Sequence, residues 1–318
     1  MLNIITKYGK ILGIVLFVII VFSLDWRKTI GIISRIDLKF LFSAVMLFPL
    51  FVFLKALRWN ILLKGQGLDY PLTSCFTVYL SSNFLGVLTP SRVGEISKIL
   101  YLKQDRDLSF SRGLSSVLAD RFFDLSILSF VAFIAFFVIF ETYRLFTASV
   151  ILISIAGIII FWINSKRLDN FIKGFLYRKK RRRLYRRIRI FCLSLLSFRL
   201  NTIGYSFILS FSGIMLFFLI CHLLALSLHL KPDLFFIPFS VSIANFAAIL
   251  PISVSGIGIR DFVLILVFGK AGFPPETALS FSILFLFYFT GLWTLTGWIA
   301  WNIKPISIPK EQLKEEIT

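Results

Sequence analysis

The sequence pattern that decides the fold is an interrupted apolar segment, NFLGVLTPSRVGE at residues 83–95, which recurs as NFAAILPISVSGIGIRD at residues 245–261. Both copies read Asn-Phe, a few apolar residues with Leu, then Pro, then Gly with Arg and an acidic residue. They interrupt the apolar regions 72–102 and 234–270 with Pro, Gly, Ser and charged side chains, which do not fit an uninterrupted spanning helix. We therefore expect each region to be a broken or re-entrant helical segment.

The composition of the chain is that of a membrane protein. Of its 318 residues, 58% are apolar and 16% charged, and the mean hydropathy is +0.87, whereas soluble domains are nearer half apolar and a quarter charged. The sequence predicts an all-α polytopic membrane protein with about six spanning helices besides the two broken segments, eight apolar segments in all. The spanning helices are expected at residues 8–24, 40–57, 117–140, 145–164, 202–230 and 276–302.

The two copies of the interrupted segment divide the chain into halves of similar plan. Each copy follows two expected spanning helices and precedes one, so each half crosses the membrane three times and the halves should form two inverted repeats. We expect a single integral membrane domain at residues 1–304, with repeat one at about 8–140, repeat two at about 145–302, and a short cytoplasmic tail at 305–318.

Broken backbone at membrane depth needs polar partners, because N–H and C=O groups find no water in hydrocarbon. In transporters, paired broken helices mark the substrate site near the repeat interface. The repeat thus predicts a polar cavity at mid-depth, which the first segment enters from inside and the second from outside. The alternative is that Pro and Gly merely kink two helices for packing. The residues expected to break the backbone are Pro90, Gly94, Pro251, Gly256 and Gly258.

Positive charge sets the expected orientation. The net charge is +19, and Lys and Arg accumulate in the loop at residues 165–200; short loops of this kind stay on the cytoplasmic side. We expect a multi-pass protein of the cytoplasmic (inner) membrane with its N-terminus and C-terminus both cytoplasmic. The first loop runs against this topology, because it is placed outside although cations outnumber acids in it. It carries Arg27, Lys28, Arg35 and Lys39 against Asp25 and Asp37.

The basic run at residues 166–189 has more than one interpretation. Clustered Lys and Arg could bind nucleic acid or an anionic lipid surface. We interpret the run as a topology anchor that is also attracted to anionic lipid, and we expect no nucleic-acid partner.

Several charged residues lie in or beside the apolar regions and are candidates for substrate binding. Arg92, Arg121 and Arg260 are expected to grip an anionic headgroup, because a guanidinium presents a planar fork of donors and stays charged. Half-helix N-termini after Pro90 and Pro251 would add backbone N–H donors. The acids would keep the empty cavity near neutrality, which would also permit coupling to a proton or cation. The full set is Arg58, Asn83, Arg92, Glu95, Asp120, Arg121, Asp124, Asn245, Ser253, Ser255, Arg260 and Asp261.

Some of these positions carry an alternative. Asp120 and Asp124 share one helical face with Arg121 beside them, and they are either buried and paired or solvated at a helix end at the interface. Arg58, which precedes Trp59, is expected to be an interface anchor, with a lipid-phosphate contact as the sharper option.

Motifs of enzyme and metal chemistry are not evident in the sequence. His222 and His229 are seven residues apart without a nearby carboxylate, and the three cysteines are scattered. We find no His-Glu-x-x-His, nucleophile elbow or phosphate-cradling Gly loop. We therefore expect no catalytic residues, no metal and no cofactor.

These features together resemble the flippase-like membrane domain family, which includes the transmembrane region at the front of lysylphosphatidylglycerol synthases. The resemblance covers nearly the whole chain and departs from the family pattern at Asp261, where Glu is usual, and at residues 89–92, where a Leu-Pro-Gly-like segment is usual. It rests on Arg58-Trp59, on Asn83-Phe84 through Pro90 to Gly94-Glu95, on Asp120-Arg121 with Asp124, and on residues 251–261.

The resemblance implies movement of an amphiphilic, charged lipid between leaflets, with the broken segments forming the lipid site. In the two-part synthases a separate soluble domain performs aminoacyl transfer, and here only about 16 residues follow the last expected helix. We therefore expect a non-enzymatic, flippase-like transporter of a membrane phospholipid or another amphiphilic lipid. The alternatives are a polyprenyl-diphosphate phosphatase-like membrane enzyme, whose phosphate loop and paired glutamates are not evident here, and an accessory scaffold of a glycolipid pathway with a pathway enzyme as its partner.

Overall fold

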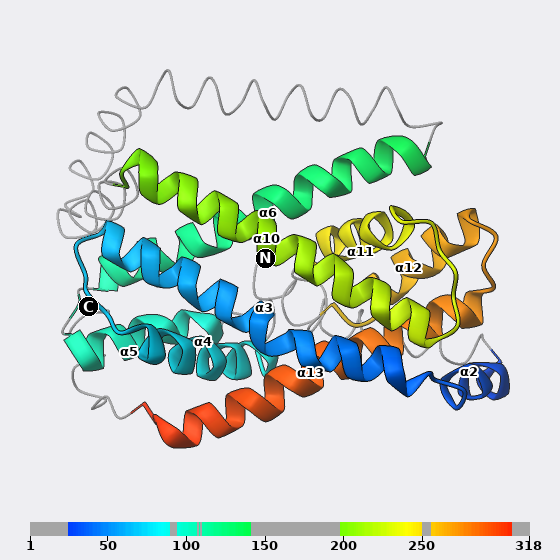
Figure 1. Cartoon of the computed structure of the whole chain (residues 1–318), viewed down its shortest axis with the longest axis horizontal. Coiled ribbons are helices and arrows are strands. Elements are labelled where there is room, and N and C mark those ends of the chain that lie inside the picture. The colour runs from blue at the N-terminus through cyan, green and yellow to red at the C-terminus, as the bar shows by residue number, and fades with distance from the viewer. Residues whose placement is uncertain are drawn as a thin grey trace, which may run out of the picture.

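The computed structural model describes residues 25–89, 94–106, 108, 110–140, 198–249 and 256–306. Within these ranges every regular element is helical (Figure 1). The helices are α2 (Trp26–Ile33), α3 (Leu38–Gly65), α4 (Leu72–Val87), α5 (Ser97–Arg106), α6 (Phe110–Ile139), α10 (Leu200–Ser227), α11 (Phe236–Ala247), α12 (Ile259–Lys270) and α13 (Pro275–Ile303).

Four of these helices, α3, α6, α10 and α13, are long and apolar enough to cross a membrane. They contain 28 to 30 residues, which at 1.5 Å per residue gives about 42 to 45 Å, more than the hydrocarbon thickness. They confirm the spans predicted at 40–57, 117–140, 202–230 and 276–302. The spans predicted at 8–24 and 145–164 lie outside the described residues.

The first interrupted region forms a re-entrant hairpin of α4 and α5. These helices contain 16 and 10 residues, so neither is long enough to cross. Tyr70, just before α4, donates a hydrogen bond to Asp105 near the end of α5, which shows that the hairpin begins and ends at the same end of the bundle. We call this the α4–α5 end. There α3 and α13 end, and α6 and α10 begin (Figure 1).

The second interrupted region folds in the same manner from the opposite end. Helices α11 and α12 contain 12 residues each. The ring of Phe236, at the start of α11, lies 4.9 Å from the ring of Phe268 and 5.3 Å from that of Phe273, at the end of α12. This α11–α12 end is where α3 and α13 begin and α10 ends (Figure 1). The broken character of both regions is confirmed, and the inverted repeat stays a prediction.

The α4–α5 hairpin is fastened to the end of α13. Lys304 donates to Asp105, and its Nζ lies 3.2 Å from the Tyr70 hydroxyl. The hydroxyl of Tyr101 on α5 donates to the Lys304 carbonyl at 2.8 Å. Burial and the hydrogen bond to Asp105 raise the pKa of Tyr70 well above its usual value. The phenol therefore stays protonated and keeps donating at physiological pH.

Two turns before the end of α13, close packing against α4 depends on Gly297. A Cβ at this position would lie 2.6 Å from the carbonyl oxygen of Leu80 and 2.6 Å from the Cβ of Phe84. The absence of a side chain lets the two helices approach, which is the usual way in which membrane helices gain contact.

We expect Gly297→Val to force α13 away from α4 and to lower the free energy of unfolding by about 1 to 3 kcal/mol, the usual cost of overpacking. Gly291→Val is the matched control, because nothing lies within 4 Å of a Cβ at Gly291 on the same helix. Thermal unfolding of both variants in detergent measures the difference. Equal unfolding temperatures would contradict this account of the contact.

Candidate functional site

Four charged residues of α3 and α6 meet in the interior of the bundle. Lys55 and Arg58 lie one turn apart on α3, and Asp120 and Asp124 lie one turn apart on α6, so each pair shares one helical face. Arg58 donates to Asp120 through Nε at 2.9 Å and through Nη2 at 2.6 Å. Arg58 also donates to Asp124, and Lys55 Nζ lies 2.5 Å from Asp124 Oδ1.

The α4–α5 hairpin completes this arrangement. Lys98 on α5 donates to Asp120 Oδ2 at 3.1 Å, and the hydroxyl of Tyr79 on α4 donates to the same oxygen at 3.4 Å. The Lys98 ammonium also lies 3.6 Å from the centre of the Tyr79 ring, within cation–π range. On α10, Ser210 accepts from Arg58 Nη1 at 2.8 Å. We call Lys55, Arg58, Lys98, Asp120 and Asp124 the charged network.

The charged network is almost completely shielded from solvent. Arg58 and Lys98 are 0% exposed and Asp120 is 1% exposed. Asp120 is therefore buried and paired, and the alternative of a solvated acid at a helix end is wrong for this residue. The expectation that Arg58 is an interface anchor is also wrong, because an anchor would reach the headgroups. Full pairing is the physical reason, since an isolated charge in hydrocarbon is too costly.

The helices place the charged network at depth. Arg58 lies about 10 Å from the end of α3, and Lys55 and Asp120 lie about 15 Å from the ends of α3 and α6 at 1.5 Å per residue. Gln66, just after α3, donates to Ser115 in the second turn of α6 at 2.8 Å, so the end of α3 lies level with the first turns of α6. Charges at this depth are functional candidates by default.

The charges of the network do not cancel. Three cations surround two carboxylates, which leaves one formal positive charge in a region of low dielectric constant. The network is most open at Asp124, whose side chain is 21% exposed.

A second ion pair lies at the first break. Arg121 on α6 contacts Glu95, which follows the break in the first interrupted region, and the Arg121 side chain is 31% exposed. Glu95 fits against Gly86, where an added Cβ would come within 2.7 Å of its Cγ. At Gly94 a Cβ would collide with the Leu85 carbonyl oxygen. These two glycines allow the chain to fold back on itself.

At the second break the chain turns at two glycines, and an acidic side chain caps the helix that follows. Gly256 and Gly258 have φ values of 81° and 89°, in the left-handed region that favours glycine. Asp261 accepts from the Gly258 N–H at 2.7 Å and from the hydroxyl of Ser282 on α13. The Arg260 guanidinium lies 3.4 Å from Asp261 Oδ1 and 4.8 Å from the centre of the Phe285 ring. Both charged residues are buried.

The remaining predicted residues are placed as follows. Asn83 and Asn245 occupy equivalent places in α4 and α11, and each amide donates to the carbonyl four residues earlier, at 2.8 Å in both helices. Pro90, Arg92, Pro251, Ser253 and Ser255 lie outside the described residues. The structure therefore brings Arg58, Asp120 and Asp124 together, sets Glu95 against Arg121, and keeps Arg260 with Asp261 at the other break.

Sequence reasoning missed Lys55, Lys98 and Tyr79. Lys55 had a detectable signal, because it is a single charge inside the apolar run 40–57. Lys98 looked like one of several loop cations, and nothing in its local sequence shows that the hairpin brings it to Asp120.

Comparison with known proteins agrees with this architecture. The family described as "Lysylphosphatidylglycerol synthase TM region" matches residues 10–297. A UPF0104 membrane protein of Pyrococcus horikoshii is 29% identical over 36% of this chain and 35% of its own length. Two UPF0104 membrane proteins of Methanocaldococcus jannaschii are 25% identical over 90% of this chain and 91% of theirs, and 28% identical over 73% of this chain and 99% of theirs.

We expect Asp120→Ala to lower the free energy of unfolding by about 3 to 5 kcal/mol, because it leaves the buried Arg58 and Lys98 without their shared carboxylate. Thermal unfolding in detergent measures this loss. The exposed Asp233, replaced in the same way, is the control and should change nothing. An unfolding temperature of Asp120→Ala equal to that of the wild type would contradict the role assigned to this carboxylate.

Proposed function

The chain belongs to the lysylphosphatidylglycerol synthase transmembrane-region family, and from that premise we propose that it is a flippase-like transporter that moves an amphiphilic lipid with a charged headgroup between leaflets. The observation that carries the proposal is the charged network, which lies deep in the bundle beside the first re-entrant hairpin. Buried ionisable groups in membrane proteins line the paths of polar substrates and ions. A lipid headgroup is the polar group that a membrane supplies on both sides.

Charge favours an anionic headgroup. The network holds one more cation than carboxylate, and a phosphodiester carries one negative charge. The charged side chains that a headgroup could reach are those of Arg121 and Asp124. They lie one turn apart on α6 and are partly exposed. On the same helix Phe122 and Phe130 are strongly exposed. The headgroup would contact Arg121 while the acyl chains stay in the bilayer along these rings.

The two hairpins supply a means of alternating exposure. One enters from the α4–α5 end and the other from the α11–α12 end (Figure 1). If the halves are inverted repeats, as the sequence predicts, each hairpin closes the site toward one side, and exchanging their positions would expose it first to one leaflet and then to the other. Arg260, buried with Asp261 at the second break, is then the counterpart of the Arg121 pair in the other state.

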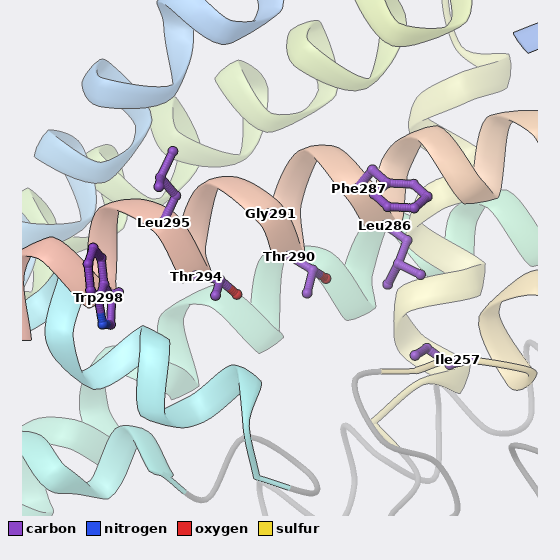
Figure 2. Close-up of a pocket in the computed structure, with 8 residues that line it drawn as sticks. All are labelled: Ile257, Leu286, Phe287, Thr290, Gly291, Thr294, Leu295 and Trp298. Atoms are coloured by element: carbon purple, nitrogen blue, oxygen red, sulfur yellow. The ribbon is translucent and has the colours of Figure 1, made fainter.

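An apolar groove along α13 supports an amphiphilic substrate. It has a volume of about 500 Å³ and lies beside Ile257, at the second break (Figure 2). Leu286, Thr290 and Thr294 project from α13 on the side that faces Ile257, and Trp298 borders the groove farther along (Figure 2). Its lining is almost wholly apolar, so an acyl chain is the occupant that fits, with the headgroup held at the break.

Family membership also supports proposals on chemistry, location and partners. The family is a transmembrane region and does not include the synthase domain, and we propose that the chain acts without enzymatic chemistry of its own. We place it in the cytoplasmic membrane with both termini cytoplasmic, so the basic run at 166–189 would face anionic lipid on that side. A pathway enzyme that makes or uses the lipid is the partner this role implies.

The transport proposal is tested by a leaflet-exposure assay in liposomes with fluorescent phosphatidylglycerol and phosphatidylcholine. We expect the wild type to equilibrate phosphatidylglycerol faster than protein-free liposomes, and Arg121→Gln to slow it about tenfold, because a charge-assisted hydrogen bond of about 1.5 kcal/mol is lost. Arg112→Gln is the matched control, since Arg112 is an exposed cation of the same helix outside the site. No acceleration by the wild type, with phosphate released from a polyprenyl diphosphate, would favour an enzyme instead.

The preference between lipid headgroups tests, in a separate experiment, whether the excess positive charge of the charged network selects the substrate. Lys55→Met leaves Arg58 and Lys98 facing Asp120 and Asp124, so the network becomes neutral. We expect the preference for phosphatidylglycerol over phosphatidylcholine to fall about tenfold, as the loss of about 1.4 kcal/mol of attraction requires. Lys64→Met, an exposed cation on the same helix, should keep the wild-type ratio. An unchanged ratio in Lys55→Met would show that the network does not select the headgroup.

A further inference from the structure

Two cations of the first loop, Lys28 and Arg35, have a structural explanation that topology does not give. The two acids of this loop act as helix N-caps. Asp25 accepts from the backbone N–H groups of Arg27 at 2.9 Å and Lys28 at 3.4 Å, and Asp37 accepts from the N–H of Lys39 at 2.9 Å. Capping places each carboxylate at the positive end of a helix. Both acids of the loop are therefore engaged by backbone N–H groups.

Two of these cations, Lys28 and Arg35, border a cavity at the α11–α12 end. The cavity has a volume of about 480 Å³ and lies between α2, the end of α10 and the beginning of α13. Ile32 and Leu228 contribute to its apolar wall. Its polar lining is made by Lys28, Arg35, His229, Glu276 and Thr277.

Arg35 is the free cation of this cavity. Lys28 is shared between Asp25 at 3.9 Å and Glu276 at 4.0 Å, whereas Arg35 makes no ion pair in the part of the chain that the structure describes. Its backbone is nonetheless fixed, because its carbonyl oxygen lies 2.7 Å from His229 Nε2. His229 adopts φ 58°, a left-handed conformation uncommon for residues other than glycine. The turn that ends α10 thus places His229 where it holds the Arg35 backbone at the rim of the cavity.

The side chains around the cavity are typical of the level of lipid headgroups. Helix α2 exposes Trp26 and Ile30, and α3 begins with exposed Leu38 and Phe42. Trp at a helix end and large apolar side chains beside it are typical of the boundary between hydrocarbon and headgroups. A ligand of the cavity therefore meets cations at one end and hydrocarbon at the other.

We propose that this cavity binds the phosphate group of a membrane phospholipid, held by the planar fork of Arg35 and by the Lys28 ammonium. The acyl chains extend over Trp26 and Ile30 into the bilayer. Glu276 opposes the phosphate and restricts where an anion can lie in the cavity, so the binding is selective for the position of the anion and not simply attraction to a basic surface. This site is separate from the charged network and does not depend on lipid transport.

Calorimetric titration of the full chain in a neutral detergent tests the proposal with soluble dioctanoyl phosphatidylglycerol as the probe. We expect Arg35→Gln to weaken binding about tenfold, the loss of a charge-assisted pair, and Glu276→Gln to tighten it because a repulsive charge is removed. Arg27→Gln is the matched control, an exposed cation of the same loop that does not line the cavity. Arg35 is exposed, so its replacement should leave the unfolding temperature unchanged.

Two further arms decide the source of the phosphate. Dioctanoylglycerol, which has the same chains and no phosphate, should bind at least about tenfold more weakly. Inorganic phosphate should compete only weakly, because it lacks the chains that contact α2. Competition by inorganic phosphate at the affinity of the lipid would overturn the lipid assignment in favour of a free anion. Equal losses in Arg27→Gln and Arg35→Gln would overturn the site itself and leave a nonspecific basic surface.

Discussion

The ion pair between Arg58 and Asp120 is the interaction on which the rest of the structure depends. Hydrocarbon offers neither partner an alternative, and apolar membrane helices gain little from burying one another because lipid is just as apolar. A paired charge therefore specifies which helix faces of α3 and α6 meet. Asp120 has a second oxygen, and that oxygen receives Lys98 and Tyr79 from the hairpin. The position of the re-entrant segment is thus set by the same carboxylate that joins the spanning helices.

The backbone groups at the two helix breaks are satisfied in different ways. Freed backbone groups must be satisfied at mid-depth. At the first break, the Thr89 hydroxyl accepts from the Gly94 N–H at 2.7 Å and the chain returns past Gly86 and Gly94. At the second break, positive φ values at Gly256 and Gly258 turn the chain, and the carboxylate of Asp261 accepts from the Gly258 N–H. A similar run of Asn, Phe, Leu, Pro, Gly and Arg therefore leaves one acid paired with a neighbouring helix and the other capping its own.

Composition and interruption were enough to predict the helical class, the four described spans and the broken character of both segments, because these follow from length, hydropathy and the conformational limits of Pro and Gly. The partners of the charges could not be predicted. Arg58 sits near the end of an apolar run, where an anchor and a buried ion look alike in sequence. Its burial depends on Asp120, which is 62 residues away. It also depends on the α4–α5 hairpin, whose position against α3 and α6 cannot be read from the spacing of apolar residues. In the first loop the excess of cations was visible in the sequence, whereas the cavity that Lys28 and Arg35 line was not.

The excess positive charge of the network also has an electrical consequence. One elementary charge that crosses the full membrane potential gains or loses about 2.3 kcal/mol per 100 mV. A rearrangement that shifted the empty network along the membrane normal would move net charge, and an inside-negative potential would favour the state in which the network lies nearer the cytoplasm. With a monoanionic ligand in place the moving unit is neutral, so the potential would act on the return of the empty protein and leave the loaded step unaffected.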